Sequence, residues 1–116
     1  MNEGGRPRRV SEEFREILAE EIPKLKDPRI GFVTVTHVKV TADLRHARVF
    51  YTALGDDKER AATRAGLRSA SPHLRRVVGD QVRMKTLPDL EFEEDDTIGR
   101  ADRIEELIRE LHEGEA

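Results

Sequence analysis

The sequence predicts a single α+β domain whose three-stranded mixed sheet is covered by helices on one face. Three observations lead to this prediction. The chain has 116 residues, a length that suits one domain. Apolar residues recur with helical spacing in some stretches and alternate as in strands in others. A short connection joins the first two strand-like stretches, as in an antiparallel hairpin. The expected order is helix, strand, strand, helix, kink, helix, strand, helix.

The composition excludes several classes of protein. The chain has no cysteine, which rules out disulfide scaffolds, cysteine nucleophiles and cysteine-containing zinc sites. No run approaches the roughly 18 consecutive apolar residues of a membrane span, so we expect a cytoplasmic protein. Charged residues make up 39% of the chain and aromatic residues only 4%. So few aromatic side chains argue against RNA recognition by stacking bases on a sheet.

Residues 1–8 are expected to form a flexible basic arm. The arm carries Arg6 and Arg8, and Arg9 follows it directly. Two interpretations remain open: a solvated terminus, or a second contact for a polyanion.

The first helix is expected from Ser11 to Leu25. Its apolar residues form a helical stripe, and Ser11 suits the N-cap position because its hydroxyl can accept a hydrogen bond from a free amide. Pro23 should stop or kink this helix around Ile22.

Two strands are expected next, over residues 31–41 and 46–53, with a turn between them. β-branched residues dominate the first strand, but its valines change parity midway. Because a strand alternates faces with a period of two, all of these valines can face inward only if one extra residue is inserted. The sequence therefore predicts a β-bulge near Thr36 and His37.

A long helical region follows a cap at residues 55–57. It is expected to run to about Ser69, to break at Pro72 and to resume to about Val82. Pro72 removes the amide that would bond the carbonyl of Arg68. The apolar spacing nevertheless continues across the break, which predicts two helical pieces that meet at a kink and share one buried face.

The rest of the chain holds a short strand over residues 90–92, a run of acidic residues and a last amphipathic helix over residues 101–111. We divide the chain into the arm, a binding domain over residues 9–95, and an acidic C-terminal helix and tail over residues 96–116. The helix of this last segment is expected to face away from a nucleic acid.

The charge is distributed unevenly along the chain. The formal net charge of −3 combines −9 for residues 89–116 with +6 for the remainder, and residues 58–85 alone carry +6. Arg60, Arg64 and Arg68 are spaced four apart and form a ridge with the later Arg75. Like charges at this spacing repel, so the ridge lacks a local stabilising role, and arginine forks suit phosphate oxygens. The alternative is a solvated helix face.

No motif points to catalysis or to a metal site. His37 and His46 can approach each other across the hairpin, but they lack a third ligand. The acids at residues 91–96 lack the ligand pattern of an EF-hand, and we interpret them as a solvated edge. The chain has no phosphate-binding glycine motif of the P-loop or dinucleotide type. We therefore expect no cofactor, no metal and no enzymatic activity.

A set of short motifs occurs in order along the chain. The motifs run from Arg9-Val10 through Asp27-Pro28-Arg29-Ile30-Gly31, Val33-Thr34-Val35-Thr36, Thr41-Ala42-Asp43-Leu44, Ala47-x-Val49, and Ala70-Ser71-Pro72 with Leu74-Arg75-Arg76, to Leu87-Pro88-Asp89-Leu90-Glu91-Phe92. These motifs resemble those of the ribosome-binding factor A family, and the order of the elements resembles that of the type II KH domain.

The resemblance implies a KH type II-like fold in which a kink at Ala70 replaces the usual Gly-x-x-Gly loop. It also implies a non-enzymatic factor that binds small-subunit ribosomal RNA and the immature or free small ribosomal subunit. Such factors support rRNA processing and late maturation, notably after cold shock. Pro72 stands where the family often has glycine, so it breaks the helix but offers no amide to a ligand.

These arguments give one set of candidate RNA-binding residues and one alternative function. The candidates are Arg60, Arg64, Arg68, Ala70, Ser71, Arg75, Arg76, Arg83 and Lys85, with Arg6, Arg8 and Arg9 from the arm and its junction. We expect a monomer. The alternative is a protein-interaction module whose arginine ridge meets an acidic protein partner.

Overall fold

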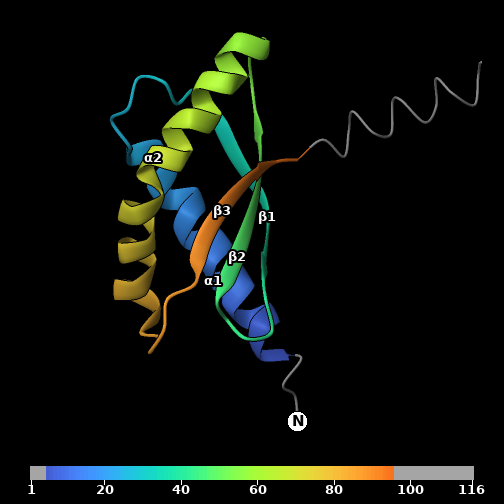
Figure 1. Ribbon diagram of the computed structural model, residues 1–116, viewed down its shortest axis with the longest axis vertical. Coiled ribbons are helices and arrows are strands. Elements are labelled where there is room, and N and C mark those ends of the chain that lie inside the picture. Colours follow the sequence, from blue (N-terminus) through green and yellow to red (C-terminus); the bar gives the residue numbers. More distant parts are fainter. Residues whose placement is uncertain (1–4, 96–116) are drawn as a thin grey trace, which may run out of the picture.

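The computed structural model describes residues 5–95, with side chains from residue 9 onward. The elements are α1 (Gly5–Glu21), the 3-10 helix η1 (Ile22–Lys24), β1 (Val33–Val40), β2 (His46–Ala53), α2 (Asp57–Val82) and β3 (Asp89–Glu94). The strands form one mixed sheet with β2 in the centre, antiparallel to β1 and parallel to β3 (Figure 1). The helix expected over residues 101–111 lies outside the described residues.

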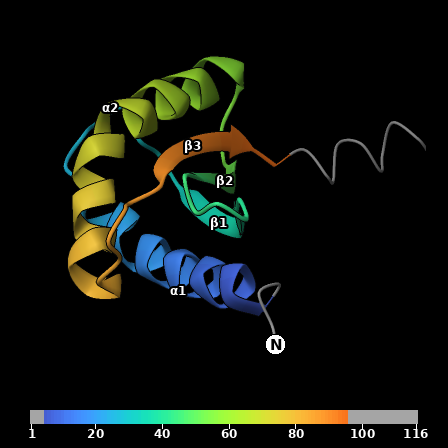
Figure 2. The same ribbon diagram turned by 60° about the horizontal axis from the view of Figure 1, so that its bottom comes forward.

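One face of the sheet is buried and the other is exposed. The strands direct apolar side chains such as Val38, Val49 and Leu90 toward the helices, and all three are buried. Helix α1 packs against β1, α2 packs against β3, and the two helices contact each other (Figure 2). The α+β class and the mixed three-stranded sheet covered on one face are therefore confirmed.

Strand β1 contains the predicted bulge. Its pairing with β2 shifts by one residue between Val35 and His37, which leaves Thr36 as the extra residue. Because of this shift, Val38 and Val40 lie on the same buried face as Val35. The bulge prediction is confirmed, and the valine pattern explains why the chain needs it.

Helix α1 begins earlier than expected. It starts at Gly5, so residues 5–8 of the expected arm are helical and the predicted start at Ser11 is wrong. Pro7 lies in the first turn, where the missing amide costs no helical hydrogen bond. Ser11 is not a cap. Its hydroxyl accepts a hydrogen bond from the Val40 amide of β1 at 3.1 Å. The predicted end is confirmed, since Pro23 lies in η1.

The start of α2 is capped as predicted. The Asp56 carboxylate accepts a hydrogen bond from the Glu59 amide at 2.8 Å, and the Glu59 carboxylate accepts one from the Asp56 amide at 3.3 Å. This reciprocal arrangement is a capping box, which satisfies two amides that have no partner within the helix.

The body of α2 is one helix and not two. It continues through Pro72 and bends near the middle of its length (Figure 2). Leu67 and Leu74 lie on opposite sides of Pro72 in the sequence, and both are fully buried. Shared packing therefore holds the two halves together, so the expected break between two helical pieces is replaced by a bend.

Candidate nucleic-acid interface

The bent part of α2 forms one wall of a groove, and β3 forms the other wall. The groove has a volume of about 760 Å³, and we call it the α2–β3 groove. It is lined by Arg64, Arg68, Ser71, Pro72, Arg75, Arg76, Asp89, Leu90, Glu91 and Phe92. The structure therefore brings five of the candidate binding residues together at one place.

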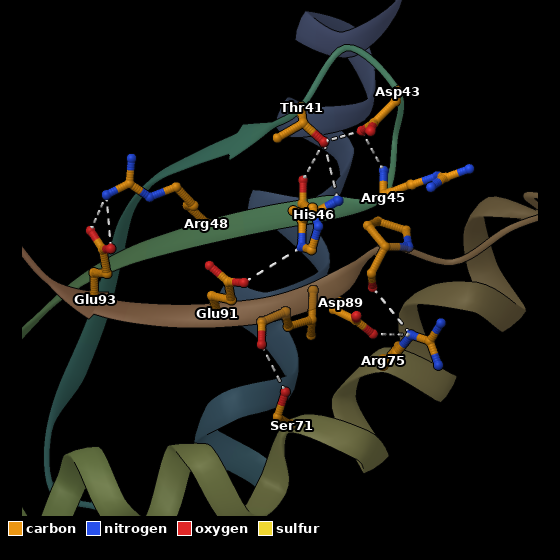
Figure 3. A network of polar contacts seen from close by, with 12 residues as sticks. Thr41, Asp43, Arg45, His46, Arg48, Ser71, Arg75, Asp89, Glu91 and Glu93 are labelled. Carbon is orange, nitrogen blue, oxygen red and sulfur yellow. Dashed lines mark hydrogen bonds and ion pairs between the residues drawn. The ribbon is translucent and has the colours of Figure 1, made fainter.

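Two candidate residues hold the groove walls together. The Ser71 hydroxyl donates a hydrogen bond to the Leu90 carbonyl oxygen at 3.1 Å. The Arg75 guanidinium donates to the carbonyl oxygens of Leu87 at 2.7 Å and Pro88 at 3.2 Å, as Figure 3 shows in part. These contacts join the middle of α2 to the segment that leads into β3. Ser71 and Arg75 therefore position the groove.

Arg60 lies outside the groove and joins the start of α2 to the end of β3. Its guanidinium donates two hydrogen bonds to the Glu94 carboxylate, each at 3.2 Å. The expectation that the arginine ridge lacks a local stabilising role is wrong for Arg60, which also pairs with Asp57 one helical turn earlier at 3.7 Å. The Glu94 partner of Arg60 and the carbonyl partners of Arg75 lie 12 to 34 residues away in the sequence, so helical spacing alone cannot reveal them.

Three arginines of the groove remain available for a ligand. Arg64, Arg68 and Arg76 are exposed, and none of them has an ion pair within residues 9–95. Arg64 also lies beside the buried hydroxyl of Tyr51. Burial raises the pKa of that hydroxyl, and the neighbouring Arg64 partly opposes the shift. The three guanidinium groups form a positive rim along α2.

The acidic side chains of β3 lie along an exposed edge strand, and two of them lie beside basic side chains of β2. The Arg48 guanidinium donates a hydrogen bond to the Glu93 carboxylate at 2.7 Å, and a Glu91 carboxylate oxygen lies 3.5 Å from Nδ1 of His46 (Figure 3). The parallel pairing of β3 with β2 produces both contacts. The interpretation of these acids as a solvated edge agrees with the structure, because β3 is an edge strand and the side chains of Glu91 and Glu93 are 55% and 41% exposed.

Sequence reasoning also missed the β3 wall of the groove. Leu90 and Phe92 supply its apolar part, and Asp89 and Glu91 supply its acidic part. The alternation of acidic and apolar residues over 89–92 is the signal that predicts one buried and one exposed side of a strand. The missing information was which helix this strand would lie beside.

The remaining candidates are divided among other places. Ala70 packs against the hydrophobic core at the bend of α2. Arg9, Arg83 and Lys85 line a second cleft with a volume of about 850 Å³. Arg6 and Arg8 belong to the first turns of α1, and their side chains lie outside the described part of the chain.

The described residues show no arrangement suited to a metal or to a membrane. Within residues 5–95, no three side chains of the metal-binding types gather into a site, and no helix has the length and apolar character to span a bilayer. His37 stacks against Phe50 with ring centroids 5.8 Å apart, while His46 lies beside Glu91. The two histidines therefore have separate neighbours.

The fold and the groove define an α+β protein with a positive helix rim beside a strand edge. A family model described as "Ribosome-binding factor A" matches residues 6–108. The protein of that name from Geobacter sulfurreducens is 46% identical over 107 residues, which cover 91% of each chain. The chain therefore belongs to the ribosome-binding factor A family.

Solved structures agree with this assignment. The crystal structure of ribosome-binding factor A from Thermus thermophilus is similar with a TM-score of 0.67 and 31% identity, covering 76% of this chain and 94% of that one. A second similar structure is a homology model of the Thermus thermophilus factor fitted into a cryo-EM map of a 30S complex. Its TM-score is 0.62 at 30% identity, covering 73% of this chain and 90% of that one.

Proposed function

We propose that this chain is a non-enzymatic factor that binds the immature or free small ribosomal subunit through its rRNA. In this role it supports rRNA processing and late maturation, including maturation in the cold, and it acts as a cytoplasmic monomer. The observation that carries the proposal is the rim of Arg64, Arg68 and Arg76, which are exposed and without ion pairs within residues 9–95. The family assignment supports it, and so does the relative described in a 30S complex.

The proposal includes a KH-like mode of binding in which the bend of α2 takes the place of a Gly-x-x-Gly loop. Ala70 packs against the core and Pro72 has no amide, so the bend offers little backbone to a ligand. The contacts therefore come from arginine side chains, whose forked guanidinium groups can each bond two phosphate oxygens.

The two walls of the groove suit different parts of an RNA strand. The arginines of α2 attract phosphates, whereas Asp89 and Glu91 on β3 repel them. Carboxylates can instead accept hydrogen bonds from base amino groups, such as the N4 amino group of cytosine. We therefore orient the sugar–phosphate backbone along α2 and the base edges toward β3.

A salt titration tests this proposal. The dissociation constant for small-subunit rRNA is measured at increasing salt for the full chain and for the triple variant R64A/R68A/R76A. Each lost phosphate contact should lower the log–log slope by about 0.7 to 0.9, so the triple variant should lose about two to three units of slope. Its unfolding transition should be unchanged, because all three side chains are exposed.

The matched control removes the same charge elsewhere. Arg15 pairs with Glu12 of the same helix, Lys24 pairs with Glu21 three residues earlier, and Lys39 is exposed on β1. The variant R15A/K24A/K39A should lose clearly less slope. Equal losses in the two triple variants would show that net charge, and not the groove, determines binding. Unchanged RNA binding in the groove variant, with lost binding to an acidic protein, would favour the protein-interaction alternative.

A further inference from the structure

The second cleft lies at a different place from the α2–β3 groove and shares no lining residue with it. It is lined by Arg9, Val10, Glu13, Asp43, Leu44, Val82, Arg83, Met84, Lys85 and Thr86. Figure 1 shows that the start of α1, the β1–β2 turn and the end of α2 lie at the same end of the molecule. Three separate parts of the chain therefore converge on this cleft.

The segment that carries two of its cations is held in place. Arg83 caps the end of α2 in the left-handed conformation, with φ of 56°, and its amide donates to the Gly79 carbonyl oxygen at 3.2 Å. Leu87 packs so closely on Gly79 that a side chain there would lie 2.5 Å from it. Residues 83–86 are therefore folded back over the end of the helix.

The basic and acidic side chains of the cleft differ in whether they already have partners. Arg9, Arg83 and Lys85 are exposed, and within residues 9–95 none of them has an ion pair. The Asp43 carboxylate is used by its own turn, because it accepts hydrogen bonds from the Thr41 hydroxyl at 2.6 Å and from a backbone amide at 3.1 Å.

The hydrogen bond from the Thr41 hydroxyl also lowers the pKa of Asp43. Glu13 is the other acidic group of the cleft, and it is exposed on α1. Three cations thus face two carboxylates, so the cleft carries a formal charge of +1. Because the three cations are exposed and have no ion pair within residues 9–95, they can bond the oxygens of an anionic ligand.

We propose that this cleft is a second phosphate-binding site, which holds a different segment of RNA from the one in the α2–β3 groove. This inference rests on the proposed function. The two sites share no lining residue, and the Arg75 contacts with the carbonyl oxygens of Leu87 and Pro88 lie in the segment between them. A protein with two such sites joins two RNA segments and fixes their relative positions.

The stoichiometry of binding tests this inference. The full chain is titrated with a fluorescein-labelled oligocytidine of about eight nucleotides at low salt, and the complexes are counted by native mass spectrometry. The wild-type chain should bind two oligonucleotides. The variants R9A/R83A/K85A and R64A/R68A/R76A should each bind one, and the control R15A/K24A/K39A should still bind two.

A proximity measurement adds an independent readout. Two oligocytidines, one carrying a donor dye and one an acceptor dye, should show energy transfer on the wild-type chain and none on R9A/R83A/K85A or R64A/R68A/R76A. If R9A/R83A/K85A still binds two oligonucleotides, the inference is overturned while the proposed function stands. If that variant binds RNA normally but no longer binds the small subunit, the cleft is a protein contact and the inference is likewise overturned. If neither R9A/R83A/K85A nor R64A/R68A/R76A binds fewer oligonucleotides than the wild-type chain, both proposals fail.

Discussion

The two faces of α2 differ in what they contribute to the protein. The inner face places small or apolar side chains such as Gly66, Leu67 and Leu74 against the sheet and the loop before β1, and all three are buried. The outer face holds Arg64 and Arg68, which are exposed. One helix therefore separates the residues that stabilise the fold from the residues that remain available to a ligand.

The inner face is packed tightly enough to define the position of a neighbouring loop. A side chain on Gly66 would lie 2.6 Å from Ile30, so only glycine allows this approach. The buried Thr63 hydroxyl accepts a hydrogen bond from the Gly31 amide at 3.1 Å and donates to the Arg29 carbonyl oxygen at 3.4 Å. The outer face makes no comparable contacts at Arg68 or Arg76. Substitutions on the inner face should therefore lower stability, and substitutions on the outer face should weaken binding.

The largest effect is expected for Leu74→Ala on the inner face. Leu74 is fully buried beyond the bend, and its truncation should lower the free energy of unfolding by about 2–5 kcal/mol through lost contacts and a cavity. Urea denaturation followed by circular dichroism measures this change. The outer-face control R68A should change stability by no more than about 0.5 kcal/mol. Similar losses in the two variants would contradict the division of α2 into two faces.

Adjacent residues of α2 allow a sharper comparison. Arg75 donates to the carbonyl oxygens of Leu87 and Pro88, whereas its neighbour Arg76 has no ion pair within residues 9–95. R75A should therefore lower the free energy of unfolding by about 1–2 kcal/mol, a value reduced for partial exposure. R76A should leave stability unchanged and weaken RNA binding. The two single variants differ by one position and remove the same charge.

The variant R75K separates the effect of the positive charge from the effect of the hydrogen-bond geometry. R75K keeps the positive charge but cannot reproduce the two bonds of the guanidinium fork. Its stability should therefore fall close to that of R75A. A full rescue by lysine would show that Arg75 acts through its charge on Asp89, which lies 3.6 Å away, and not through the two carbonyl oxygens.

Local patterns in the sequence predict much of this fold, because their physical causes are local. The parity change of the valines predicts the bulge at Thr36, and the Asp56 cap predicts the start of α2. Pro72 shows where local reasoning is incomplete. It predicts a disturbance of the helix, but packing across the bend decides whether the helix ends or continues.

The candidate site is less predictable, because its charge balance depends on contacts between distant residues. Arg60 and Arg64 look equivalent in the sequence, yet only Arg60 lies beside the Glu94 carboxylate, which is 34 residues away. The same applies to Glu93, whose partner Arg48 comes from a parallel strand. Charge counted along the chain locates the arginine-rich helix but not the arginines that remain without an ion pair.

The smallest effect is expected at Tyr51 of β2, which lies beside Arg64 of α2. Its side chain is fully buried, and its hydroxyl makes no hydrogen bond of good geometry within residues 9–95. Burying an unpaired hydroxyl costs about 1–3 kcal/mol, so Tyr51→Phe should leave the free energy of unfolding unchanged or raise it by up to about 1 kcal/mol. A clear loss of stability would show that the hydroxyl has a partner, and a double-mutant cycle with R64A would then identify whether Arg64 supplies it. Unchanged stability with weaker RNA binding would instead show that the Tyr51 hydroxyl positions Arg64 in the groove.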